Sequence, residues 1–185
     1  MFKNLFILIS FTLLYIRKVR KRLFCKLYQF RFKSVGENII FDPDSVFSFK
    51  TIELGSNIYI GPGAYFSSSH SYIKICSNVM FGPNVLLLGG NHKIDVIGEY
   101  MFNIDEKDEY TDAPIIIESD VWIGANVVVL KGVTVAEGCV IGAGSVLTKS
   151  TKPYSIYAGN PARFIRSRFT DADVLSHKSR LKKYE

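Results

Sequence analysis

A six-residue repeat constrains the fold of this chain more than any other feature of its sequence. Between residues 115 and 152 a large aliphatic residue recurs at every sixth position, and a small or β-branched residue follows each one four positions later. An α-helix repeats every 3.6 residues and a strand every two, so neither produces this spacing. The first column is Ile117, Ile123, Val129, Val135, Ile141 and Leu147, and the second is Val121, Val127, Val133, Cys139 and Ser145.

The repeat predicts an all-β solenoid. Six residues supply one short strand and one turn, three such units close a triangular coil, and both columns then point into the coil. One coil cannot bury its own apolar face, so coils must stack about 4.8 Å apart. A β-sandwich of short strands is the alternative, but it does not explain six hits in register. Glycines, which suit tight corners, lie near the expected corners at positions 124, 132, 138, 142 and 144.

Weaker hexads extend the solenoid towards the N-terminus. They begin near Val35, and the register shifts at Leu54 and again at Ile75. The phase after Ile75 matches that of the later hexads, so residues 93–112 are expected to form an excursion from a continuous solenoid. This excursion carries seven acidic residues. Long irregular loops are often functional, which favours an arm that walls a substrate pocket over a neutral insertion.

The sequence therefore divides into three segments: a helical extension at 1–33, the solenoid at 34–152 and a C-terminal cap with a short helix at 153–185. The cap is polar, as suits a segment that covers exposed strand edges. Three widely separated cysteines, Cys25, Cys76 and Cys139, predict neither a disulfide framework nor a metal site, and they favour a reducing cytoplasm.

Basic charge is concentrated at the N-terminus. The net charge is +6, but residues 1–33 hold nine of the 23 Lys and Arg residues and no acidic residue. The remainder is net acidic, which argues against nucleic-acid binding. Residues 5–16 are almost wholly apolar, yet twelve helical residues span only about 18 Å, short of the roughly 30 Å hydrocarbon core. The basic stretch that follows favours peripheral contact with the inner face of a membrane; packing on the solenoid or on a second subunit is the alternative.

His92 is the candidate general base among three histidines. It follows Gly89-Gly90 at a solenoid corner, at the root of the excursion, and imidazole titrates near neutral pH. His70 and His177 are more simply surface residues.

Several segments resemble the hexapeptide-repeat acetyltransferase family, and most closely its xenobiotic, maltose/galactoside and capsule O-acetyltransferase branch. They are Asn91-His92 ahead of a loop, DVWIGAN, KGVTV, VIGAGSVLTKS and PYSIYAGNPARFIR, and the similarity covers about residues 35–169. The resemblance implies a left-handed parallel β-helix, a homotrimer with active sites between subunits, and acetyl-CoA as the donor, with no metal.

The resemblance also implies site residues. His92 would remove a proton from an acceptor hydroxyl, which attacks the thioester directly, with Asn91 beside it and Asp95 as a possible orienting partner. Residues that match coenzyme A contacts are Trp122, Ala125, Ala143, Thr148, Lys149, Pro153, Arg163 and Arg166. The alternative for Trp122 is an aromatic that seals a subunit interface, and for the basic residues it is a solvated surface.

The apolar, basic leader and the long acidic excursion depart from the small-sugar enzymes of the family. They favour a saccharide acceptor on a surface-polysaccharide precursor, either a glycan or a lipid-linked saccharide. N-acetylation or acetylation of an antibiotic on the same scaffold remains open, as do a zinc carbonic-anhydrase-like enzyme and a non-catalytic scaffold. A zinc carbonic-anhydrase-like site would require a closely spaced histidine pair that this sequence lacks.

Overall fold

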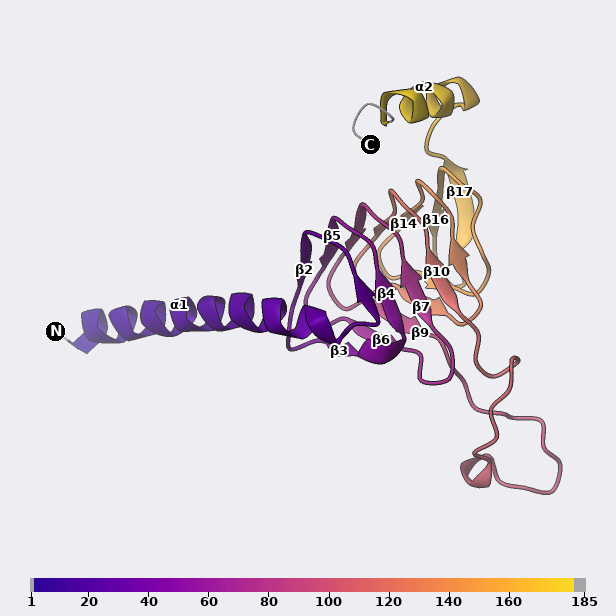
Figure 1. Ribbon diagram of the computed structural model, residues 1–185, viewed down its shortest axis with the longest axis horizontal. Coiled ribbons are helices and arrows are strands. Elements are labelled where there is room, and N and C mark those ends of the chain that lie inside the picture. Colours follow the sequence, from indigo (N-terminus) through magenta and orange to yellow (C-terminus); the bar gives the residue numbers. More distant parts are fainter. Residues whose placement is uncertain (1, 182–185) are drawn as a thin grey trace.

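The computed structural model describes residues 2–181, so residue 1 and residues 182–185 of the predicted terminal segments lie outside it. Its body is a parallel β-helix whose three sheets form the faces of a triangular prism (Figure 1). Each coil contributes one strand to each face in turn, and five coils stack from the N-terminal to the C-terminal end. The solenoid predicted from the hexads is confirmed, and it is the left-handed parallel β-helix that the family resemblance implied.

Three sheets, here named A, B and C, make up the prism. Sheet A contains β1 (Ser34–Val35), β4 (Ile52–Leu54), β7 (Ile73–Ile75), β10 (Ile115–Ile117) and β13 (Thr134–Val135). Sheet B contains β2 (Ile39–Phe41), β5 (Ile58–Ile60), β8 (Val79–Phe81), β11 (Trp122–Ile123), β14 (Val140–Ile141), β16 (Ser155–Ala158) and the antiparallel β17 (Arg163–Ser167). Sheet C contains β3 (Val46–Phe47), β6 (Tyr65–Ser67), β9 (Leu86–Leu88), β12 (Val128–Leu130) and β15 (Val146–Leu147).

Both hexad columns point into the prism, as predicted. Every residue of the two columns between positions 117 and 147 is buried. The core changes character along the axis. In the first three coils it contains a run of stacked phenylalanines, in which Phe47 meets Phe66 edge-to-face and Phe66 meets Phe81 at a tilt. The core of the last two coils holds no Phe and is mostly Ile, Val and Leu. The aromatic end lies where the N-terminal helix meets the prism.

Asparagine, as well as the glycine expected from the sequence, occupies tight corners where the backbone has a positive φ. Asn38, Asn57 and Asn78 occupy successive turns between sheets A and B, each with a φ near +60°. Their side chains form a ladder, in which each amide nitrogen donates to the next amide oxygen at 3.0 Å. Asn tolerates this left-handed conformation better than other residues with a Cβ. The ladder ties the coils together outside the core.

Most of the predicted N-terminal helical extension is a single helix, α1 (Phe2–Tyr28). It projects from the first coil (Figure 1). Only its C-terminal end packs on the prism, through the half-buried Cys25 and Tyr28. A short 3-10 turn, η1 (Gln29–Arg31), leads into the first strand, and Arg31 stacks 4.2 Å from the ring centroid of Phe49 in the second turn, η2 (Phe49–Thr51).

The C-terminal helix, α2 (Asp171–Leu181), lies beside the edge of the prism between sheets A and B at the last coils, rather than over the C-terminal end (Figure 1). Thr170 begins this helix with a capping box, because its hydroxyl accepts the Asp173 N–H while the Asp173 carboxylate accepts the Thr170 N–H. The Arg168 guanidinium lies 2.6 Å from the Asp120 carboxylate, and His177 of α2 lies 3.4 Å from the same group. These contacts fix the cap on the last coils.

Candidate active site

The excursion begins and ends at the edge of the prism between sheets C and A, here called the C–A edge. It runs from the end of β9 to the start of β10 and contains one 3-10 turn, η3 (Met101–Asn103). A bridge between Gly90 and Asp112, with the Ala113 N–H donating to the Gly89 carbonyl at 3.1 Å, closes its base. The loop beyond the bridge projects from the body (Figure 1).

His92 lies just beyond this bridge, as expected from the sequence, and its side chain is exposed. It lines a polar hollow of about 300 Å³. The neighbouring Asn91 accepts the His92 backbone N–H on its side-chain oxygen at 2.9 Å, and the Lys107 ammonium donates to the Asn91 carbonyl at 2.5 Å. The hollow is lined by Ser67, Ser69, His70, Gly90, Asn91, His92, Lys107 and Asp112.

His70 shares this hollow, although the sequence analysis treated it as a surface residue. Its side chain is exposed, as expected, but it stands on the C–A edge one coil before His92. The corresponding signal in the sequence is the serine-rich corner after β6, which lies directly beside the corner after β9 because these strands pair. The structure therefore brings two imidazoles to the mouth of one hollow.

Asp95 lines a second hollow, of about 270 Å³, on the other side of His92. Among residues 2–181, no hydrogen bond joins the Asp95 and His92 side chains. The orienting role of Asp95 stays a prediction.

Ion pairs hold the base of the excursion in place. The Lys93 ammonium lies 3.1 Å from the Glu106 carboxylate and 3.5 Å from that of Asp108. Backbone N–H groups of Thr111 and Tyr110 donate to Asp108, and together with Lys93 they lower the pKa of its carboxyl. Beyond this base, apolar side chains such as Ile97 and Phe102 are almost fully exposed. The loop thus has an ordered acidic base and an apolar tip.

The residues predicted to contact coenzyme A fall into groups. Ala125 and Ala143 lie on the edge between sheets B and C, one coil apart, and the Gly144 N–H donates to the Ala125 carbonyl at 2.8 Å. Thr148 and Lys149 are exposed and follow β15 on the C–A edge. They therefore share an edge with His92, two coils away, or about 10 Å at the usual strand spacing.

Trp122 and Arg166 share the outer face of sheet B. Trp122 is 52% exposed, and the register continues from it through Val140 and Ile156 to Arg166 on β17. Arg163 and Arg166 are exposed, and within the described part of the chain each guanidinium donates only to a carbonyl of an adjacent residue. Pro153 lies apart from them, in a hollow beside α2.

One chain does not bring all the predicted site residues together. His92, Thr148 and Lys149 lie on the C–A edge, whereas Ala125 and Ala143 lie on the edge between sheets B and C. The whole of sheet C separates the two edges. Within residues 2–181, no three His, Cys, Asp or Glu side chains are grouped so as to hold a metal ion.

Comparison with known proteins places the fold and this site in context. The family described as "Bacterial transferase hexapeptide (six repeats)" matches residues 114–149. A solved structure of a galactoside acetyltransferase in complex with coenzyme A is 33% identical in sequence to this chain. The match covers 80% of this chain and 71% of the galactoside acetyltransferase chain, with a TM-score of 0.66. The chain belongs to the hexapeptide-repeat acetyltransferase family.

Other members of the hexapeptide-repeat acetyltransferase family give the same assignment. Galactoside O-acetyltransferase of Escherichia coli (strain K12) is 36% identical over 140 residues, which is 73% of this chain and 64% of the relative. A protein of Lysinibacillus sphaericus named "Probable macrolide acetyltransferase" is 40% identical over 111 residues, 55% of this chain and 61% of the relative. The match thus spans less than two thirds of these two curated relatives.

Membership confirms the family predicted from the sequence. At the level of the family, it also confirms the predicted enzyme class, an acyltransferase, and acetyl-CoA as the donor. The comparisons do not test the individual site residues, which remain predictions.

Proposed function

We propose that this chain transfers an acetyl group from acetyl-CoA to a hydroxyl of a saccharide, on a precursor of a surface polysaccharide. The observation that carries the proposal is the position of His92. Its exposed imidazole stands at the mouth of a polar hollow, at the base of a projecting loop, in a chain related to galactoside O-acetyltransferase. The hydroxyl, amide and charged side chains of the hollow suit a ligand rich in hydroxyl groups.

The proposed reaction is a direct transfer in which His92 is the general base. The imidazole takes the proton of the acceptor hydroxyl as that oxygen forms a bond to the thioester carbonyl carbon. The carbon–sulfur bond then breaks, and the imidazolium returns the proton to the departing coenzyme A thiolate. The Asn91 side-chain oxygen accepts the His92 backbone N–H, and its amide NH₂ is the proposed donor to the tetrahedral intermediate. An amide donor can stabilise the negative charge of the tetrahedral intermediate.

The donor site is proposed to form between subunits of a homotrimer. Support comes from the separation of the predicted contacts onto two edges of one chain. A neighbouring copy that placed its Ala125 and Ala143 edge beside the C–A edge of the first would bring His92 and both alanines to one groove. Arg163, Arg166 and Lys149 would then supply positive charge to the phosphates, and Trp122 and Pro153 apolar contact to the rest of the cofactor.

The acceptor is proposed to be a large or lipid-linked glycan on the cytoplasmic side of a membrane. The hollow that holds His92 lies at the base of the excursion, and the excursion projects away from the body (Figure 1). An antibiotic is the second candidate, favoured by the similarity to the relative from Lysinibacillus sphaericus. For such a ligand, the exposed Ile94, Ile97 and Phe102 of the excursion would provide an apolar wall.

Thiol release from acetyl-CoA, measured with a panel of saccharides, a macrolide and an amino sugar, tests the proposal. We expect turnover with a saccharide hydroxyl and none without an acceptor. His92→Ala should lower kcat by about 10²- to 10⁴-fold, the usual contribution of a general base. It should leave the oligomer and acetyl-CoA binding unchanged, since the imidazole is exposed and outside the core.

Calorimetric titration with coenzyme A separates an acetyltransferase from the non-catalytic and carbonic-anhydrase-like alternatives. Absence of binding to the purified chain would reject acetyl transfer altogether. Turnover retained by His92→Ala would reject only the assignment of the base. Preference for the macrolide or for the amine would identify a different acceptor on the same scaffold.

A further inference from the structure

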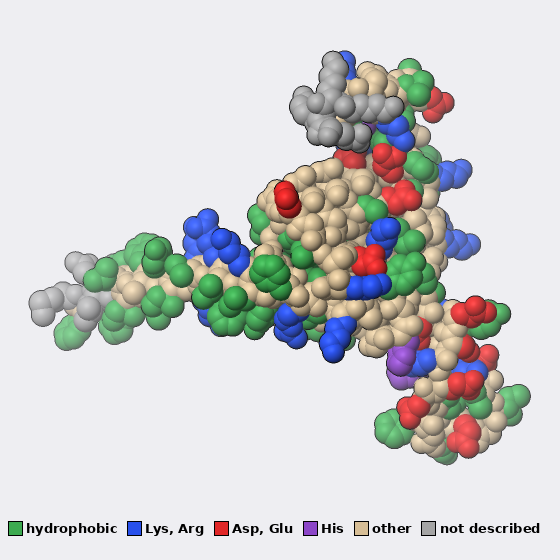
Figure 2. Space-filling view, viewed as in Figure 1, with side chains coloured by type: hydrophobic (Ala, Val, Ile, Leu, Met, Phe, Trp, Pro, Cys, Tyr) green, Lys and Arg blue, Asp and Glu red, His purple; other side chains and the backbone are tan. Residues whose placement is uncertain are grey.

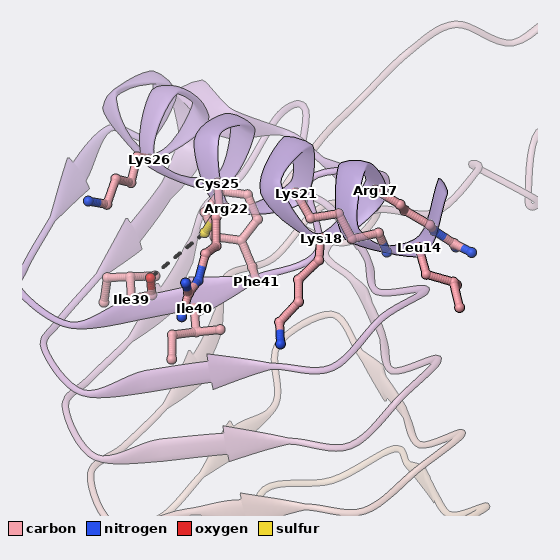
Figure 3. Close-up of a pocket in the computed structure, with 10 residues that line it drawn as sticks. All are labelled: Leu14, Arg17, Lys18, Lys21, Arg22, Cys25, Lys26, Ile39, Ile40 and Phe41. Carbon is pink, nitrogen blue, oxygen red and sulfur yellow. Dashed lines mark hydrogen bonds between the residues drawn. The ribbon is translucent and has the colours of Figure 1, made fainter. Parts of the chain in front are cut away.

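A large hollow lies far from His92, in a groove between α1 and β2. It has a volume of about 580 Å³ (Figure 3). The edge strand β2 of the first coil forms its floor, through the exposed Ile40 and the buried Ile39 and Phe41, and α1 forms its roof. The helix contributes Leu14, Arg17, Lys18, Lys21, Arg22, Cys25 and Lys26 to the lining.

The charge of this groove is unusual for a helix that packs on a sheet. A helix normally turns apolar residues towards its partner, but here five basic residues and no acidic residue line the space. The apolar stripe of the same segment, which includes Val19, Leu23 and Leu27, is exposed instead. Figure 3 shows Lys18 and Arg22 reaching from the helix towards the first coil.

Only part of this positive charge is neutralised within the described chain. The Lys21 ammonium pairs with the Asp42 carboxylate, and Arg20 lies 3.1 Å from Asp44. These two pairs anchor the helix to the turn after β2. Among residues 2–181, no ion pair involves the other four basic residues of the groove, which are Arg17, Lys18, Arg22 and Lys26. Side chains of this kind beside an apolar floor suit a ligand with an anionic head and an apolar tail.

Residues 6–16 of α1 are apolar on all sides apart from Ser10 and Thr12. Side chains on all sides of this segment are exposed, among them Phe6, Leu8, Phe11 and Leu13. Figure 2 shows these hydrophobic side chains along the projecting helix and basic side chains where the helix approaches the body. No helix of the described residues is long and apolar enough to cross a membrane. Residues 2–16 would extend about 22 Å, enough to enter one leaflet of a bilayer with a core of roughly 30 Å.

We propose that the groove between α1 and β2 is a binding site for the phosphate headgroup of an anionic phospholipid. Residues 2–16 enter the leaflet, and Arg17, Lys18, Arg22 and Lys26 lie at the depth of the headgroups. The lipid phosphate accepts hydrogen bonds from these side chains. Its acyl chain leaves the groove past Leu14, which lies at the end nearest the apolar half of the helix (Figure 3).

This site would also orient the enzyme on the membrane. Because α1 leaves from the first coil, the first coil lies nearest the bilayer and later coils stack away from it (Figure 1). His92 follows the third coil, about 10 Å further along the prism at the usual strand spacing. The lipid site itself does not depend on the proposed acetyl transfer, so membrane binding can be measured without turnover.

Vesicle flotation of the full chain tests the charge of the groove. We expect binding to phosphatidylcholine vesicles that contain phosphatidylglycerol, weak binding to phosphatidylcholine alone, and a loss of affinity as salt rises. The triple variant Lys18→Gln, Arg22→Gln, Lys26→Gln should bind the anionic vesicles on the order of a hundredfold more weakly, at roughly fivefold for each basic residue near the surface. The matched control is Lys50→Gln, Lys74→Gln, Lys152→Gln, which removes the same charge from exposed positions on the body.

A second pair of variants tests the groove itself rather than the charge of the helix. Ile40→Glu places a carboxylate on the floor of the groove, and Val46→Glu places one elsewhere on the first coil. Both positions are 54% exposed on short strands, so both variants should fold. Native mass spectrometry of the detergent-solubilised wild-type chain should detect bound phosphatidylglycerol. We expect this bound lipid to be absent from Ile40→Glu and present in Val46→Glu.

Four results would overturn the proposal. They are equal binding to zwitterionic and anionic vesicles, equal effects of the two glutamate variants, displacement of the chain from vesicles by inorganic phosphate at matched ionic strength, and self-association through α1 that leaves no lipid bound. The third would identify a soluble phosphate as the ligand, and the fourth a second copy of this chain. Loss of acetyl transfer with intact lipid binding would contradict only the proposed function.

Discussion

Substitution of Gly124 by alanine tests how tightly successive coils are stacked beside the predicted donor site. Gly124 occupies the turn between sheets B and C, immediately before Ala125. A Cβ added there would lie 2.7 Å from the Ala143 nitrogen and 2.8 Å from the Ile141 oxygen. Both are backbone atoms of the next coil, and the Gly124 N–H already donates to that Ile141 oxygen at 2.8 Å. Neither atom can turn away as a flexible side chain would.

The magnitude follows from the displacement that the methyl group requires. The closer contact is about 0.7 Å shorter than the 3.4 Å at which ordinary van der Waals contact begins. Coils four and five must therefore separate locally, which weakens the hydrogen bonds between them. Overpacking of a rigid site costs about 1–3 kcal/mol, and one weakened backbone hydrogen bond about 1 kcal/mol. We expect Gly124→Ala to lower the free energy of unfolding by about 3 kcal/mol.

Gly144→Ala is the matched control, because it isolates backbone conformation from space. Gly144 has a φ of +72°, but a Cβ there would meet nothing within 4 Å. The cost of holding alanine in the left-handed region is about 1–2 kcal/mol. Urea unfolding at equal protein concentration should therefore rank the wild type above Gly144→Ala and Gly144→Ala above Gly124→Ala. If Gly144→Ala is the less stable variant, the coils are not stacked as tightly as this reasoning requires.

Two further predictions concern cofactor binding and acid stability. Trp122→Ala should raise KM for acetyl-CoA roughly tenfold, which corresponds to about 1.4 kcal/mol of lost binding energy. Because the indole is half exposed, kcat and thermal stability should stay nearly unchanged. An unchanged KM together with a dissociated oligomer in sedimentation would instead assign Trp122 to a subunit interface. Partial burial alone would raise the pKa of Asp42, but the Lys21 ammonium, the Asp44 N–H and the Arg17 charge outweigh it and hold the pKa below its ordinary value of 3.8. The contribution of Asp42 to the anchoring of α1 is therefore complete above about pH 4 and is lost as the pH falls through the lowered pKa. Hydrogen exchange in residues 17–28 should accelerate over that range, and Asp42→Asn should remove the pH dependence; an unaltered dependence in that variant would contradict the anchoring role.

The fold could be predicted from the sequence because the inward residues repeat at a period that no other regular structure shares. Ile117 and Val121 are equivalent to Ile123 and Val127, so one local rule, applied repeatedly, fixes the strands, corners and core. The role of Asn38, Asn57 and Asn78 was missed because their ladder joins residues about twenty positions apart. It becomes visible only after the length of each coil is known.

The site could be predicted only in part. His92 was identifiable because glycines and the start of the excursion mark its corner. His70 was not, because its proximity to His92 depends on the pairing of β6 with β9. Likewise, the sequence predicted basic and apolar character in the N-terminal helix but not which face meets the prism. The ion-pair partners that hold this face on the prism, Asp42 and Asp44, lie in the turn after β2, more than twenty residues further along the chain.

The sequence by itself determined the family, the β-helix, the inward columns and the candidate base, because each of these depends on local patterns or on motifs within a few residues. The tertiary structure decided which edges carry the site residues and how α1 meets the first coil. It placed His92 with His70 on the C–A edge and set Ala125 and Ala143 on another edge of the prism. It also turned the basic side chains of α1 towards an apolar strand. These arrangements depend on contacts between coils, and the order of residues along the chain does not encode such contacts locally.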